Sequence, residues 1–423
     1  MGAKIVQDQT KLQTFLFVKK NFLIGGIEVC MYNFIVWLVN HHFRVIYVKV
    51  KGSEIHPSIS NVLEKRVEVY ECDFTERNCI KKMNIPFSES ENVLAYVFSF
   101  YYFSFIDDLK VCYPNINIHS YYWLAHYEGQ FIEDVYPKCL RPLIKPCAKQ
   151  YVKNLERNNN IIYLHKAHEK SFIEHYCYKT INNGLKYADY GRYYPEYCES
   201  DVVNRYDSDF FLIVSIARLS FPHKGYMIGL LKEFSVLRKK YKHVRLRIIG
   251  DGEGRNILET LIESFDKEVR DSIELVGSVF FDDLGVYCKD ANLNISLAGG
   301  VSSAAMYAVP SLVVRHSGTL YTCEAYGFLP ESKDKVVCTE PGNPVLPYIE
   351  DVMNMTKEQY LDLSQKSYNT YYTPRELVDE MYIKQMNNLN IDPHKLSPCF
   401  MRHFLKTTFI LAKKSNFKPK IRL

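Results

Sequence analysis

The sequence of 423 residues lacks several features that mark specialised classes of protein. It has no long uninterrupted apolar run, which disfavours a signal peptide or a membrane-spanning helix, so we expect a cytoplasmic protein. Its 12 cysteines are scattered without a Cys-x-x-Cys pair, so we expect neither a zinc site nor a structural disulfide. No solenoid-type repeat is visible. These absences leave an ordinary globular protein.

Acidic residues are missing from the end of the chain. None follows Asp392, whereas eight lysines and arginines do, interleaved with apolar side chains. Residues 393–423 are therefore predicted to form a basic amphipathic tail. It either contacts an anionic membrane surface, at the inner face, or docks on the protein by its apolar side, and the sequence leaves both open. Because the basic excess is confined to this tail, we expect no nucleic-acid partner.

What is present indicates two compact domains. Hydrophobic residues make up 47% and charged residues 24%, which are globular values, and the length exceeds that of one typical core. In the first half, apolar runs predict a parallel, Rossmann-like domain over residues 1–190. A helix is predicted over 27–40 after a Gly-Gly break, and strands at 12–18, 44–50, 67–70, 93–98, 116–119 and 161–164.

The second half repeats this pattern after a polar, tyrosine-rich stretch, 182–209, that reads as a linker. We predict a second Rossmann-like domain over 205–385. Its strands are expected at 210–216, 244–249, 273–275 and 293–297, and its helices at 226–241 and 256–265. The predicted fold class is thus α/β, with two Rossmann-like domains.

Two cations bracket the loop that follows the first strand of the second half. Arg218 stands just after the strand and Lys224 just before the helix. Cations at a strand end and a helix start, with the helix dipole pointing the same way, suit a diphosphate group. A loop with solvated cations is the alternative that local chemistry leaves open.

The segments that follow this loop, in their order, strengthen the diphosphate interpretation. Leu246–Glu253, Ile273–Val279, Asp290–Ser296 and Ala308–Val314 resemble the donor domain of the family 4 glycosyltransferases, which have the GT-B architecture. The resemblance implies a cleft between the two domains and donor-diphosphate contacts from Arg218 and Lys224. It also implies donor-binding turns at Gly250 and Gly277.

The first half carries the same resemblance. Gly25 and Gly26 match a glycine-rich loop that faces the cleft, and Asn183-Gly184 matches a turn before the interdomain linker. The resemblance further implies a histidine facing the donor sugar. His119, at the end of the apolar run 116–119, is the first candidate, and His126 is the second.

One departure from the family concerns its two glutamates, which stand eight positions apart before a Gly-x-Pro turn. Counted back from Pro310, they fall at Ile295 and Ser303, and neither is acidic. The glycines and hydroxyls of this stretch are instead predicted to bind donor phosphate or ribose oxygens. They are Gly299, Gly300, Ser302 and Ser303.

The resemblance implies a hexosyltransferase-type enzyme that moves a sugar from a nucleotide diphosphate sugar to a glycan or lipid-linked acceptor. It further implies retention of configuration and a role in bacterial surface polysaccharide synthesis. No metal and no cofactor are expected, because Arg218 and Lys224 would take the role of the metal ion of GT-A enzymes. Two alternatives stay open: a nucleotide-sugar epimerase, and a catalytically silent sugar-binding or scaffold subunit, which the missing glutamates motivate.

Overall fold

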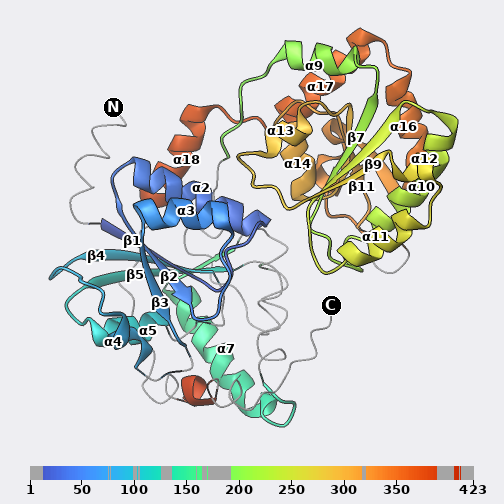
Figure 1. Cartoon of the computed structure of the whole chain (residues 1–423). Coiled ribbons are helices and arrows are strands. Elements are labelled where there is room, and N and C mark those ends of the chain that lie inside the picture. The colour runs from blue at the N-terminus through green and yellow to red at the C-terminus, as the bar shows by residue number, and fades with distance from the viewer. Residues whose placement is uncertain are drawn as a thin grey trace. The chain divides into compact units, whose positions relative to one another are not determined.

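The computed structural model describes residues 13–74, 76, 78–98, 102, 105–124, 136–158, 160–163, 169, 192–316, 321–387, 404–408 and 410. They form two compact units, each built around one sheet (Figure 1). The first unit contains Met1–Leu23, Ile27–Gly191 and Val378–Arg422, and the second contains Ile24–Gly26 and Arg192–Leu377. Among the described helices, none is long and apolar enough to cross a bilayer.

The sheet of the first unit has six parallel strands in the order β3-β2-β1-β4-β5-β6, which is the doubly wound order of Rossmann domains. Helices cover both faces of such a sheet, so its strands are continuous apolar runs, as the fully buried centre of β1 illustrates. The strands are β1 (Gln13–Lys19), β2 (Arg44–Val50), β3 (Glu68–Cys72), β4 (Asn92–Val97), β5 (Asn117–Leu124) and β6 (Ile161–Tyr163).

Helices of the first unit come from both ends of the chain. The early ones are α2 (Gly26–Asn40), α3 (Pro57–Arg66), α4 (Cys79–Met83), α5 (Phe105–Cys112) and α7 (Arg141–Arg157). The late helix α18 (Arg375–Asn387) packs on α2, where the Trp37 indole donates a 2.8 Å hydrogen bond to Asp379 and the Phe34 ring stacks on Tyr382. This contact joins the end of the chain to its beginning.

Part of the basic tail also packs on the first unit. Leu405 and Ile410 are buried, Leu405 lies in the same core cluster as Ile144 of α7, and Lys406 forms an ion pair with Asp108. Of the two alternatives for the tail, docking by apolar side chains is therefore confirmed for residues 404–408 and 410. The other residues of the predicted tail lie outside the described part of the chain.

The second unit has a seven-stranded sheet in the order β13-β12-β11-β10-β7-β8-β9, of which the last five are parallel. The antiparallel strands β12 and β13 extend one edge. The strands are β7 (Phe211–Ile216), β8 (Val244–Ile249), β9 (Ile273–Gly277), β10 (Leu293–Ser296), β11 (Ser311–Val314), β12 (Glu324–Phe328) and β13 (Asn343–Pro344). The strands predicted from the sequence in both halves are confirmed as strands, with ends that shift by up to five residues, the largest shift being at the end of β5.

The helices of the second unit surround this sheet (Figure 1). They are α9 (Glu199–Tyr206), α10 (Tyr226–Lys240), α11 (Arg255–Glu263), α12 (Lys267–Arg270), α13 (Leu284–Cys288), α14 (Gly299–Ala305), α15 (Leu329–Ser332), α16 (Val345–Met353) and α17 (Lys357–Tyr371). The linker prediction over 182–209 is wrong for Glu199–Tyr206, which form α9. Residues 182–191, with the predicted turn Asn183-Gly184, lie outside the described part of the chain. Helix α9 is held by Arg205, whose buried guanidinium donates to the carbonyls of Lys289, Tyr307 and Ala308.

Candidate functional site

The candidate site lies at the carboxyl edge of the second sheet, where five parallel strands end together. In open α/β sheets this edge is where ligands bind. The loop after β7 is fastened to the loop after β8 by backbone hydrogen bonds. Ala217 donates to the Ile249 carbonyl at 3.0 Å, Leu219 to Asp251 at 3.0 Å, and Gly254 to Leu219 at 2.9 Å. The loop that carries Arg218 and Lys224 is therefore held in place.

Glycine is required at this edge by chain packing. A Cβ atom on Gly250 would lie 1.9 Å from the Ala217 carbonyl oxygen, and one on Gly300 would lie 2.1 Å from that of Ile216. Gly277 has a positive φ of 88° and accepts a hydrogen bond from the Gly250 amide. Packing and backbone conformation thus explain why glycine stands at these predicted donor-binding positions, without reference to a ligand.

Arg218 and Lys224 supply positive charge at this edge. The pKa of the nearby Glu253 carboxyl is lowered, first by hydrogen bonds from its own backbone and from Ser220 and then by the charge of Arg218. Arg218 is exposed and Lys224 is half-buried, and neither forms an ion pair with any described side chain. Burial lowers the pKa of the Lys224 ammonium from its ordinary 10.5 to about 8. A buried cation without a carboxylate partner is costly, and an anionic ligand would offset that cost. The structure thus brings the two predicted residues to one edge.

Two histidines extend this group, and motif reasoning missed them. Nε2 of His316 lies 2.6 Å from Nδ1 of His223, so one ring donates a hydrogen bond to the other. Burial, and then the neighbouring charge of Lys224, lower the pKa of His316. Their positions in the sequence could have indicated them, because His223 precedes Lys224 and His316 follows β11 by two residues at the same edge.

The start of α14 completes the edge. Ala298 has a positive φ of 49°, and the exposed Gly299 begins the helix. The Ser302 hydroxyl donates to the Gly299 carbonyl at 3.1 Å. The Ser303 hydroxyl accepts a 3.3 Å hydrogen bond from the guanidinium of Arg192, a residue that sequence reasoning did not single out.

The missing glutamates therefore have different structural settings. Ile295 is fully buried in β10, where an apolar side chain fits the core. Ser303 is half-buried and faces a cation, Arg192, which forms no ion pair within the described chain. At the second position a hydroxyl and a guanidinium thus stand where the resemblance places a carboxylate.

Residues predicted in the first half of the sequence have mixed outcomes. Gly25 follows β1 in the chain and Gly26 is the first residue of α2, exposed and with open space where a Cβ would be. Lys19, the last residue of β1, forms an ion pair of 3.0 Å with Glu28 of α2. The role of the glycine pair as a ligand-facing loop stays a prediction.

The prediction that His119 ends a strand is wrong. His119 is the third residue of β5, opposite Leu94 of β4, and the strand continues to Leu124. At about 3.3 Å per residue, five further residues place the carboxyl edge roughly 16 Å away. The strand was predicted too short because Ser120 and the tyrosines after it look polar, although Ser120, Tyr121 and Tyr122 are buried. His126 lies outside the described residues.

An Asp-x-Asp triplet, the motif that chelates a metal ion in GT-A enzymes, occurs at Asp207-Ser208-Asp209, and motif reasoning missed it. It precedes β7, whereas Arg218 follows that strand, so the two stand at opposite edges of the sheet. Asp207 is paired with Lys357 at 2.8 Å. The triplet is therefore no part of the candidate site.

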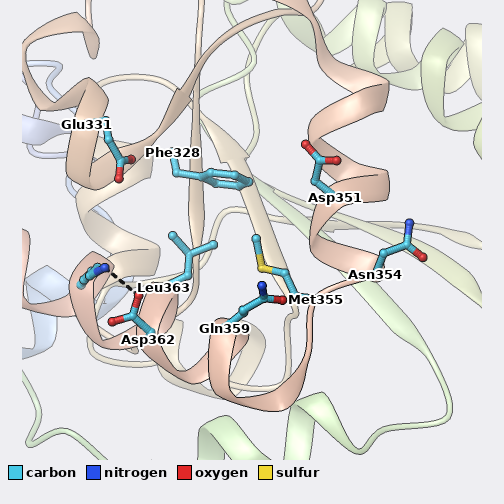
Figure 2. Close-up of a pocket in the computed structure, with 9 residues that line it drawn as sticks. Phe328, Glu331, Asp351, Asn354, Met355, Gln359, Asp362 and Leu363 are labelled. Atoms are coloured by element: carbon cyan, nitrogen blue, oxygen red, sulfur yellow. Dashed lines mark ion pairs between the residues drawn. The ribbon is translucent and has the colours of Figure 1, made fainter.

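A surface hollow of the second unit is also separate from this site. Figure 2 shows it between β12, α15, α16 and α17, with Phe328, Glu331, Asp351 and Asp362 among its lining residues. Phe328 pairs with Leu312 near the amino end of β11, opposite the edge that carries Arg218. The carboxylates of the hollow would repel a nucleotide diphosphate.

The chain is similar in structure to solved proteins, although not in sequence to any family model. No family model and no curated protein matches the chain. Among solved structures, TarM of S. aureus, in complex with alpha-GlcNAc-glycerol and UDP, superposes with a TM-score of 0.54 at 10% identity, covering 90% of this chain and 100% of that one. The chain has the GT-B fold.

Two further structures agree with this fold. WaaG, a glycosyltransferase involved in lipopolysaccharide biosynthesis, gives a TM-score of 0.51 at 12% identity over 87% of this chain and 99% of that one. Sucrose-phosphate synthase from Thermosynechococcus elongatus gives 0.54 at 12% identity over 89% and 98%. At such identities the likeness establishes the GT-B fold, while membership of family 4 stays a prediction.

Proposed function

We propose that the chain is a glycosyltransferase that moves a hexose-type sugar from a nucleotide diphosphate sugar to a glycan or lipid-linked acceptor. The observation that carries the proposal is the pair Arg218 and Lys224. They stand on one fastened loop at the carboxyl edge of the second sheet, and neither makes an ion pair with a described carboxylate. The GT-B fold, which this chain shares with a TarM complex that contains UDP, supports a nucleotide ligand.

The two cations act on the leaving group. When the bond between the anomeric carbon and the diphosphate oxygen breaks, negative charge grows on the diphosphate. The acceptor hydroxyl oxygen bonds to the anomeric carbon, and its proton passes to the departing diphosphate. Cations already held in place stabilise that charge without reorganisation. In this proposal no metal ion and no cofactor takes part, and configuration is retained, as the resemblance to family 4 implies.

The acceptor is proposed to belong to a bacterial surface polysaccharide. WaaG is described as acting in lipopolysaccharide biosynthesis, and the TarM complex contains alpha-GlcNAc-glycerol. Such an acceptor would be met in the cytoplasm, at the inner face of the membrane. These two structures support the proposed acceptor through the GT-B fold that they share with this chain.

A second candidate function is a catalytically silent subunit that binds sugars or nucleotides. Ile295 and Ser303 favour it, because each stands where the family carries a glutamate. The Arg192 guanidinium at Ser303 would favour an anionic or carbonyl group of the ligand over a ribose diol. Binding of nucleoside diphosphates without hydrolysis or transfer would identify this case.

The test is a thermal-shift panel of nucleoside diphosphates, followed by donor hydrolysis with the matching sugar nucleotides. Binding to the native state raises the melting temperature. We expect one diphosphate to stabilise the wild type and to lose its effect in Arg218→Ala, which keeps the fold because the side chain is exposed. If no diphosphate stabilises the protein, or if the Arg218→Ala variant responds like the wild type, the proposed site is wrong.

A further inference from the structure

The histidine pair His223 and His316 gives the candidate site a group that can change its charge near neutral pH. The contact joins two loops that are 93 positions apart in the sequence. His223 stands in the loop after β7, directly before Lys224, and His316 stands two residues after β11. The ring centroids lie 4.1 Å apart, with an angle of 75° between the ring planes. The pair therefore lies at the carboxyl edge, on the loop that carries the two cations of the proposed donor site.

The hydrogen bond between the two imidazoles allows the pair to hold one more proton. Nε2 of His316 lies 2.6 Å from Nδ1 of His223, so a single hydrogen lies between these two atoms. Each ring has a second nitrogen, and in the neutral pair one of these carries a hydrogen and the other a lone pair. A proton on that lone pair leaves the hydrogen bond between the rings in place. The pair can thus gain a positive charge without rearranging.

The surroundings of His316 favour its neutral form in the protein alone. Burial, and then the charge of Lys224, lower its pKa from the ordinary 6.5. Its backbone amide donates to the Cys338 carbonyl at 2.9 Å, and its chain neighbour Arg315 is paired with Glu324 at 2.9 Å. His316 itself makes no ion pair with a carboxylate of the described residues. At pH 7 the imidazole of His316 is therefore mainly neutral.

A diphosphate bound by Lys224 would reverse the electrostatic effect on His316. A diphosphate brings more negative charge than one ammonium balances, so the net charge that faces the imidazole changes sign. An opposite charge within about 4–6 Å raises the pKa of a histidine by about one to three. The ring nitrogen that gains the proton then becomes a charged donor, which suits a phosphate oxygen.

We propose that His223 and His316 belong to the diphosphate site and take up a proton when the diphosphate binds. The proton comes from the solvent and returns to it when the diphosphate leaves. The protonated pair adds positive charge beside Lys224 and gives the departing diphosphate a further N–H donor. This inference rests on the proposed function, because it needs a nucleoside diphosphate at the loop of Arg218 and Lys224. It adds a coupling between ligand binding and a proton held by a second kind of group.

The experiment is isothermal titration calorimetry of the full chain at pH 7 with UDP, ADP, GDP, CDP and dTDP. Each titration is repeated in PIPES, MOPS and Tris, because the dependence of the observed enthalpy on the ionisation enthalpy of the buffer gives the number of protons bound. Wild type is compared with His316→Gln, whose amide is polar but does not titrate near neutral pH. The matched control is His243→Gln, since His243 is exposed and precedes β8, at the amino edge of the same sheet.

We expect wild type and His243→Gln to take up about half a proton more than His316→Gln when a diphosphate binds. The comparison between variants cancels the protons that Lys224 and the diphosphate exchange. The affinity of His316→Gln should be about tenfold lower, because a charged hydrogen bond is lost. His316→Lys should regain affinity without the additional proton, because a lysine is already charged at pH 7. The same variant serves in the proton comparison if the melting temperature shows that His316→Gln does not fold.

Two results would contradict this inference, and they differ in what they say about the proposed function. If a diphosphate binds and wild type takes up no more protons than His316→Gln, the histidine pair is not coupled to the ligand, and the proposed function stands. If none of the five diphosphates binds to wild type, the proposed function fails and the inference fails with it.

Discussion

Lys224→Met removes a charge that the protein buries while keeping most of the apolar stem. Lowering the pKa of Lys224 from 10.5 to about 8 corresponds to a burial cost of about 3 kcal/mol in the charged form, at about 1.4 kcal/mol for each pKa step of one. The variant without ligand should therefore have a higher free energy of unfolding than wild type, by up to about 3 kcal/mol at neutral pH.

The difference in stability depends on pH in a definite direction. Below pH 8 the lysine is protonated in both the folded and the unfolded chain, so wild type carries the full burial cost. Between pH 8 and 10.5 the unfolded chain holds the proton more tightly, and the contribution of this group to wild-type stability rises with pH. The advantage of Lys224→Met should thus be largest below pH 8 and shrink above it.

The same substitution should weaken the response to nucleoside diphosphates. At a ligand concentration of about 100 times Kd, binding stabilises a protein by about 2.7 kcal/mol. Loss of one hydrogen bond to a charged group typically weakens binding about 10- to 100-fold, so about 1.3 to 2.3 kcal/mol of that gain should disappear. In wild type the affinity should also fall as the pH rises through 8, because the ammonium loses its proton.

The assay is urea unfolding at several pH values, with and without the diphosphate that the panel identifies. Lys232→Met is the matched control, since Lys232 lies exposed on α10 and makes no ion pair with a described residue. Lys224→Arg should restore ligand binding only in part, because a guanidinium is planar and longer. A Lys224→Met protein that is less stable than wild type yet keeps the full ligand effect would refute the reasoning.

Three further predictions concern the fold and the histidine assignment. Gly300→Ala should lower the free energy of unfolding, measured in urea, by about 1–3 kcal/mol, because its Cβ would lie 2.1 Å from the Ile216 carbonyl oxygen. The Cβ of Gly299→Ala would have no atom within 4 Å, so this control should change the stability little. Leu405→Ala should destabilise the first unit by about 2–5 kcal/mol; an unchanged midpoint would mean that the tail does not pack in solution. His119→Gln should leave the rate of sugar transfer unchanged, and a tenfold loss would restore His119 as a site residue.

Much of this fold could be predicted from local sequence patterns. Strands buried on both faces are continuous apolar runs, so β1 and β7 were found within a residue or two. The loop with Arg218 and Lys224 could also be predicted, because the strand before it and the helix after it are adjacent in the sequence.

Contacts between distant segments decided the rest. β5 continues past His119 because the Asn160 amide donates to the backbone carbonyl of Ser120 and the hydroxyls of Tyr122 and Tyr151 share a hydrogen bond, which offsets the cost of burying these polar groups. His223 meets His316 across 93 positions, and Arg192 meets Ser303 across 111. No periodicity encodes such pairs. They exist only once parallel strands have brought their carboxyl ends to one edge, and the low pKa of Lys224 follows from that burial rather than from any feature of its sequence.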